Sequence, residues 1–136
     1  MRIDFDELNK ILSVFLNSKE PFITLRDLNF FDVEGEEENK LVFHLLLLVE
    51  NGLISNRHLQ TGDPKHIGII FSSRGVGGAS IPIRLTQDGH DFANALNKKP
   101  ILERLKQDFA DAPFEMLKDV SKDLLTSFVK NKLGFE

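Results

Sequence analysis

Three side chains near residue 90 have the chemical types that bind metal ions. Asp88, His90 and Asp91 fall within one helical turn after Thr86. The helical spacing turns His90 away from Asp88, so a metal site would need a further ligand from elsewhere in the chain. We therefore predict no metal site here. Instead, Gly89 should allow close packing and His90 should make local hydrogen bonds.

A glycine-rich stretch, 72–78, resembles a phosphate-binding loop at first sight. It lacks the lysine and hydroxyl of a P-loop, and it precedes a predicted strand rather than a helix. We interpret it as the flexible tip of a hairpin. The chain has no cysteine, no serine in a nucleophile-elbow context and no carboxylate pair of recognisable spacing. We therefore predict that the protein is not an enzyme and has no catalytic residue, cofactor or small-molecule ligand.

Basic residues suggest a different chemistry, contact with nucleic acid. Residues 1–56 contain 5 bases and 11 acids, whereas residues 57–84 contain 4 bases and 1 acid, a net charge of +3. A basic hairpin can hold backbone phosphates without reading the base sequence. The alternative is that four bases over 28 residues form an ordinary solvated surface. The four bases are Arg57, Lys65, Arg74 and Arg84.

Five segments have the spacing of amphipathic helices. Apolar residues recur every three or four positions, and helix signals flank several of the segments. Asp4 with Glu7 forms a start that resembles a capping box, Gly52 supplies a left-handed stop, and Thr86 is a good N-cap. The predicted helices cover 4–18, 36–51, 87–98, 100–109 and 113–133.

Short β-favouring segments lie between these helices. Residues 22–25 predict an edge strand and 26–35 an irregular connection, while 53–54, 67–73 and 80–85 predict strands of one small antiparallel sheet. Turn residues at 61–64 and 74–78 separate the strands. The predicted fold class is therefore α+β.

The order of these elements resembles that of a winged helix-turn-helix domain. Residues 44–54 resemble the end of its recognition helix, with the pattern H-L-x-x-L-x-x-x-G-L-I, and 83–92 resemble its strand-to-helix return, R-L-T-x-x-G. The fuller string RLTxxGHDF resembles an uncharacterised family of small bacterial and phage-associated winged-helix proteins. The resemblance covers about 4–98 and implies no activity. Residues 25–35 depart from it, because they leave little room for the usual second helix.

The resemblance implies a winged-helix-like domain over residues 1–98 and a helical extension over 99–136. The outer face of the helix at 36–51 carries two residues that suit DNA, Asn39 and Lys40. It also carries Phe43 and Leu47, which do not, and three glutamates at its start would repel phosphate. We therefore expect the C-terminal helices or a second subunit to cover this face.

The last predicted helix has a heptad-like seam that includes Leu117, Leu124 and Phe128. Such a helix either closes over the core or pairs with a copy of itself to give a homodimer. The longest apolar run, 45–49, is far shorter than a membrane span, and the N-terminus has acids where a signal peptide would be basic. We predict a cytoplasmic protein that does not contact a membrane.

Two functions remain open at this point. The first is a DNA-binding or transcription-associated factor, related to phage proteins, that contacts double-stranded DNA through its wing and through Asn39 and Lys40. The second is a protein-interaction or dimerisation module without DNA binding. Its interface would comprise Phe43, Leu47, Leu117, Leu124 and Phe128.

Overall fold

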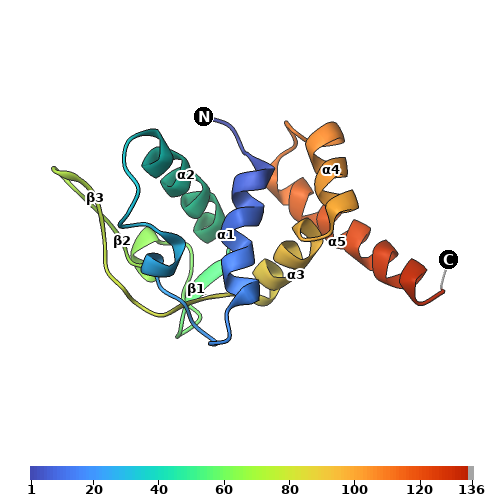
Figure 1. Ribbon diagram of the computed structural model, residues 1–136, viewed down its shortest axis with the longest axis horizontal. Helices are drawn as coiled ribbons and strands as arrows, with labels where there is room; N and C mark the ends of the chain where they lie inside the picture. Colours follow the sequence, from blue (N-terminus) through green and yellow to red (C-terminus); the bar gives the residue numbers. More distant parts are fainter. Residues whose placement is uncertain (135–136) are drawn as a thin grey trace.

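The computed structural model describes residues 1–134 and has an α+β fold (Figure 1). Over these residues it contains the five predicted α-helices, four short strands and two 3-10 helices, labelled η. Residues 135 and 136, the end of the predicted C-terminal extension, lie outside the described residues. The elements in chain order are α1 (Phe5–Asn17), η1 (Leu25–Leu28), α2 (Glu36–Glu50), β1 (Ile54–Asn56), η2 (Pro64–Ile67), β2 (Ile69–Ser72), β3 (Gly75–Gly78), β4 (Ile83–Leu85), α3 (Gln87–Leu96), α4 (Lys99–Asp108) and α5 (Phe114–Lys132).

The strands form two separate pairs rather than the single sheet that the sequence predicts. β1 pairs antiparallel with β4, and β2 pairs antiparallel with β3 as a hairpin. The predicted strand at 22–25 is reduced to one bridge between Ile23 and Ile83, because η1 already begins at Leu25. Residues 75–78, expected to be a turn, form strand β3 instead. Because Ile83 of β4 bridges to Ile23 and β4 also pairs with β1, β4 lies between Ile23 and β1.

Local signals explain where α1 and α3 begin. The Asp4 carboxylate accepts hydrogen bonds from the amides of Asp6 and Glu7, at 2.9 and 3.2 Å. Thr86 Oγ1 accepts from the amide of Gly89 at 3.0 Å, which confirms Thr86 as an N-cap. Both helices thus start at residues whose side chains satisfy free backbone amides.

Gly89 confirms the expected close packing. A Cβ at this position would overlap the carbonyl oxygen of Leu53, so α3 crosses directly over the start of β1. The Thr86 hydroxyl also donates to the carbonyl of Gly52 at 2.6 Å. α3 is therefore fixed on the turn that ends α2, where Gly52 has a φ of 71°.

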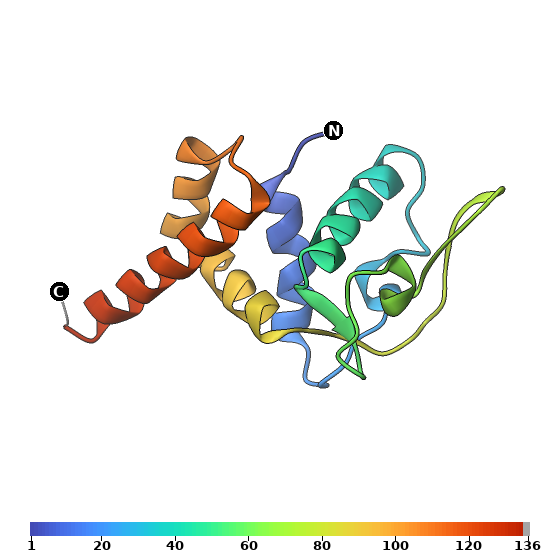
Figure 2. The same ribbon diagram turned by 180° about the vertical axis from the view of Figure 1, so that it is seen from behind.

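The C-terminal helices belong to the same core as the rest of the helices. α5 packs on α3 and α4, and α3 packs on α1. Leu8, Leu45, Leu96, Leu105 and Leu117 are all fully buried in one continuous apolar cluster. Figures 1 and 2 place α3, α4 and α5 on one side of α1 and place α2 with the β2–β3 hairpin on the other. The last turns of α5 extend beyond the body (Figure 2).

The β2–β3 hairpin projects from the body, away from α5 (Figures 1 and 2). Its base is closely packed: a Cβ at Gly78 would lie 2.8 Å from Phe30 Cε1 and 3.1 Å from Leu25 Cδ1. The amide of Ala79 donates to the carbonyl of Gly68 at 2.8 Å and continues the pairing below the named strands. The base is thus anchored on η1 and the loop after it, whereas the outer part of the hairpin is exposed.

Candidate nucleic-acid interface

The outer part of the hairpin carries an exposed cation at its tip. Arg74 lies in the turn between β2 and β3, and its amide donates to Ser72 Oγ at 3.2 Å. In the next rung from the tip, Phe71 lies opposite Val76, and one rung further Ile70 lies opposite Gly77. The hairpin thus presents a guanidinium at its end and apolar side chains along its length.

The other three predicted bases are not on the hairpin. Arg57 is exposed in the turn after β1, and Lys65 is exposed in η2, the element that leads into β2. Arg84 is half-buried on β4, where its Nε donates to the carbonyl of Leu85 at 3.0 Å. It lines a separate cleft together with Glu20 and His90. The structure therefore brings Arg74 and Lys65 onto neighbouring elements and disperses the rest of the predicted cluster.

Within residues 1–134 none of these four bases forms an ion pair. The nearest acid in sequence to Lys65 is Asp63, which caps η2 by accepting from the Lys65 amide at 2.9 Å. Six bridges elsewhere pair lysines and arginines of the helical body with carboxylates. Arg57, Lys65 and Arg74 are therefore exposed cations without an ion pair in the part of the chain that the structure describes.

The predicted contacts on α2 have a different environment. Asn39 is exposed, but the Lys40 ammonium lies 2.7 Å from Oδ2 of Asp4. The hydrogen bond from Lys40 holds the pKa of the Asp4 carboxyl below its usual range, and the same bond raises the pKa of Lys40. Lys40 thus joins α2 to the N-cap of α1, a structural role that the sequence did not indicate.

His44 forms a second link between the same two helices. It is fully buried, its Nε2 accepts from the Asp4 amide at 2.9 Å, and its Nδ1 lies 2.7 Å from the carbonyl oxygen of Lys40. Because an amide can only donate, Nε2 must be the acceptor and Nδ1 must carry the proton. His44 is therefore a neutral structural residue. It also takes the place of Glu7 in the capping box that we predicted, since it binds the amide that Glu7 was expected to reach.

The predicted protein-interface residues divide into two groups. Leu117 is fully buried, and Leu124 and Phe128 are half-buried against the core, with Lys98 Nζ 5.8 Å from the centre of the Phe128 ring. Leu117 is thus not available to a partner. Phe43 and Leu47 are partly exposed on the outer face of α2. α5 contacts the C-terminal end of α2 by a hydrogen bond. Lys118 Nζ, near the start of α5, donates to the carbonyl of Asn51, the residue that follows α2, at 3.3 Å.

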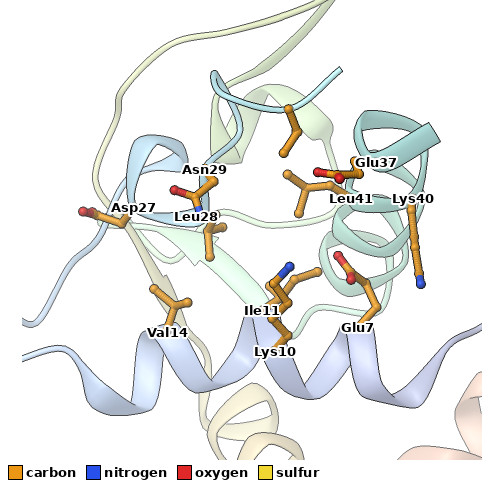
Figure 3. Close-up of a pocket in the computed structure, with 11 residues that line it drawn as sticks. Glu7, Lys10, Ile11, Val14, Asp27, Leu28, Asn29, Glu37, Lys40 and Leu41 are labelled. Carbon is orange, nitrogen blue, oxygen red and sulfur yellow. The ribbon is translucent and has the colours of Figure 1, made fainter. Parts of the chain in front are cut away.

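A cleft of about 360 Å³ lies between α1, η1 and α2 (Figure 3). The apolar side chains of Ile11, Leu28 and Leu41 face into it. Its charged lining residues are of both signs, so the cleft does not favour an anion. They are Glu7, Lys10, Asp27, Glu37 and Lys40.

Comparison of the chain with family models, curated proteins and solved structures gave no match. Within residues 1–134, no group of three or more histidine, aspartate or glutamate side chains is placed to hold a metal ion. In the same part of the chain, no helix has the length and apolar character needed to cross a membrane. Arg74, the exposed cation on the projecting hairpin, is the feature that supports a functional proposal.

Proposed function

We propose that the protein is a winged-helix-like domain that binds the backbone of duplex DNA through its β2–β3 hairpin. The order α1, Ile23, η1, α2, β1, hairpin, β4 supports the fold, as does the central place of β4 between Ile23 and β1. In this interpretation η1 replaces the second helix and the hairpin is the wing. The family resemblance and a phage association remain predictions.

The observation that carries the proposal is Arg74, an exposed cation without an ion pair in residues 1–134 at the tip of a projecting hairpin. The whole chain has a net charge of −4. An anionic molecule approaches DNA with its cationic end first, because phosphate repels the remainder. The glutamates in the first turn of α2 oppose insertion of that helix into a groove.

Binding of this kind should depend on salt and not on base sequence, because phosphate contacts carry no sequence information. We would measure fluorescence anisotropy of a labelled duplex over a series of salt concentrations. Arg74→Ala should weaken binding by a similar factor on unrelated sequences and reduce the slope of log K against log salt by about 1.

Arg104→Ala is the matched control, because Arg104 is an exposed arginine on α4 that already pairs with Asp108 at 2.7 Å. This variant should bind DNA like the unmodified protein. Absence of binding at the lowest salt concentration, or equal losses in both variants, would contradict the proposal.

A second candidate function is self-association, and a specific observation favours it. Val129 and Leu133 near the end of α5 are 47% and 66% exposed, beside the half-buried Leu125. Val129 lies in the last turn of α5 and Leu133 directly follows it, at the end of the helix that extends beyond the body (Figure 2). Sedimentation equilibrium should then detect a dimer that Val129→Ser weakens. A monomer at high protein concentration would exclude it.

A further inference from the structure

Two apolar side chains on the hairpin are not explained by contact with phosphate. Ile70 is 46% exposed and Phe71 is 53% exposed, although both lie in a strand that begins with the fully buried Ile69. Phosphate oxygens require cations and hydrogen-bond donors. An exposed phenylalanine two residues before the turn of a cationic hairpin can instead contact an apolar surface, and the bases of DNA offer one.

The hairpin is also unusually thin. β3 has the sequence Gly-Val-Gly-Gly, so Ile70 lies opposite Gly77 and Ser72 lies opposite Gly75. On this face of the ribbon only β2 contributes side chains, because side chains alternate between the two faces of a strand. On the other face Phe71 and Val76 form the outermost pair.

A thin ribbon suits the minor groove of DNA. This groove is about 6 Å wide, against about 12 Å for the major groove, which is wide enough for a two-stranded ribbon. The absence of β3 side chains on one face reduces the width that the minor groove must accommodate. Proteins that use the minor groove place arginines in it and insert phenylalanine or isoleucine side chains between base pairs. Arg74 and Phe71 provide one group of each kind on the same hairpin.

Charge disfavours the alternative docking mode, in which α2 reads the major groove. Glu36, Glu37 and Glu38 form its first turn, and its outer face continues through the partly exposed Phe43 to the exposed Glu50. Lys40, the one cation of this helix, is paired with Asp4. The hairpin is therefore better suited than α2 to contact bases.

We propose that the hairpin enters the minor groove and that the Phe71 ring inserts between two base pairs and kinks the duplex. This inference rests on the proposed function. Arg74 then lies in the groove or on its phosphates and holds the ribbon in place. Unstacking costs the least at flexible pyrimidine–purine steps, so binding sites with such a step should be preferred.

The test measures bending separately from binding. A duplex with a central TA step carries a donor and an acceptor dye at its ends, and energy transfer reports their separation. Saturation with the protein should raise energy transfer, as expected for a kink of roughly 20–90°. Phe71→Ser should abolish most of this increase and weaken binding about tenfold, as expected when one stacked base contact is lost. It should leave the salt dependence unchanged.

Ile70→Ser is the matched control, since Ile70 is similarly exposed but lies on the opposite face of the ribbon. It should bend the duplex like the unmodified protein. A single mismatch at the central step lowers the cost of unstacking, so it should strengthen binding of the unmodified protein and not of Phe71→Ser. Circular dichroism should show that both variants remain folded, because neither side chain is part of the core.

The outcomes distinguish this inference from the function on which it rests. If the unmodified protein binds DNA without bending it, the insertion is wrong and phosphate binding stands. If it does not bind DNA, both fail. If the Phe71→Ser variant bends the duplex as much as the unmodified protein does, Phe71 is not the inserted side chain and the proposal is wrong. So would a Phe71→Ser variant that loses self-association while its DNA binding is unchanged, since Phe71 would then contact protein.

Discussion

The helical body and the β2–β3 hairpin differ in how they treat charges and large apolar side chains. In the body, Lys40 pairs with Asp4, Lys106 pairs with Asp6, and the leucines of all five helices meet in one core. On the hairpin, Arg74 has no ion pair within residues 1–134, and Phe71 is 53% exposed. Exposed apolar surface next to polar or charged residues is a feature of interaction sites. The comparison also predicts that equivalent substitutions have unequal effects in the two regions.

The largest difference should come from adding one methyl group to a glycine. In Gly89→Ala the new Cβ would overlap the carbonyl oxygen of Leu53, and neither backbone can move without breaking the helix–strand contact. We expect the free energy of unfolding to fall by about 3 kcal/mol or more, as in severe overpacking. Urea denaturation followed by circular dichroism would measure this loss.

Gly77→Ala is the corresponding change on the hairpin. The nearest atom to a Cβ there is the carbonyl oxygen of Ile70 at 3.9 Å, an ordinary contact. This variant should be as stable as the unmodified protein, or slightly more stable because alanine restricts the unfolded chain. Equal losses in the two glycine variants would refute the distinction between a packed body and a free hairpin.

A smaller difference should come from replacing histidines. His44→Phe preserves an aromatic ring in the body but removes the acceptor for the partly buried amide of Asp4. Leaving a donor unsatisfied costs about 1–3 kcal/mol, so thermal unfolding should shift to lower temperature. His58→Phe changes an exposed residue in the turn after β1 and should have little effect. If His44→Phe unfolds at the same temperature as the unmodified protein, the link between α1 and α2 is dispensable for stability.

The smallest effect should be a change in the pH dependence of stability. The pKa of Asp4 is lowered in the folded protein, mainly by the hydrogen bond from Lys40. A carboxyl of this kind stabilises the fold above its unfolded pKa of about 3.9, and the contribution is lost as the pH falls through the folded pKa. In Asp4→Asn, which keeps an N-cap side chain, acid should therefore reduce stability less steeply than in the unmodified protein. The free energy of unfolding of both proteins would be measured as a function of pH. Superimposable curves below about pH 4 would show that the ion pair between Asp4 and Lys40 does not stabilise the fold.

Signals that lie close together in the sequence predicted most of the helical body. The spacing of leucines gave the five helices, and Asp4, Gly52 and Thr86 marked their ends, because capping requires only neighbouring backbone groups. These elements are determined by contacts within a few residues, and such contacts are visible in a single chain.

Features that depend on distant partners were missed. Nothing near His44 or Lys40 indicates that both bind Asp4, 40 and 36 positions earlier. η1 did have a local signal, the capping pair Thr24 and Asp27, but the β-branched residues before it favoured a strand. Strand β3 resembled a turn because glycine is rare in strands, and here the pairing with β2 outweighs that preference.

The candidate site was predicted in part. Arg74 was expected at the hairpin tip and lies there, but the sequence could not show that Arg84 turns into a different cleft or that Arg57 follows a different strand. A net charge counted along a segment does not determine where the charges lie in space. The exposure of Phe71 was also not foreseen, because the sequence predicted only that this residue lies in the strand at 67–73.

The anchoring of the hairpin at its base has a consequence for protein engineering. Gly78 against Phe30, and the hydrogen bond between Ala79 and Gly68, fix the direction in which the ribbon leaves the molecule. The tip contributes nothing to that direction, so the ribbon can be lengthened there without redesign of the interior. Inserting two residues in each strand keeps the facing partners aligned and leaves the turn on the same kind of residue pair, because hydrogen-bonded and non-hydrogen-bonded pairs alternate. The reach of the arm is thus adjustable in steps of two residues per strand, about 7 Å each.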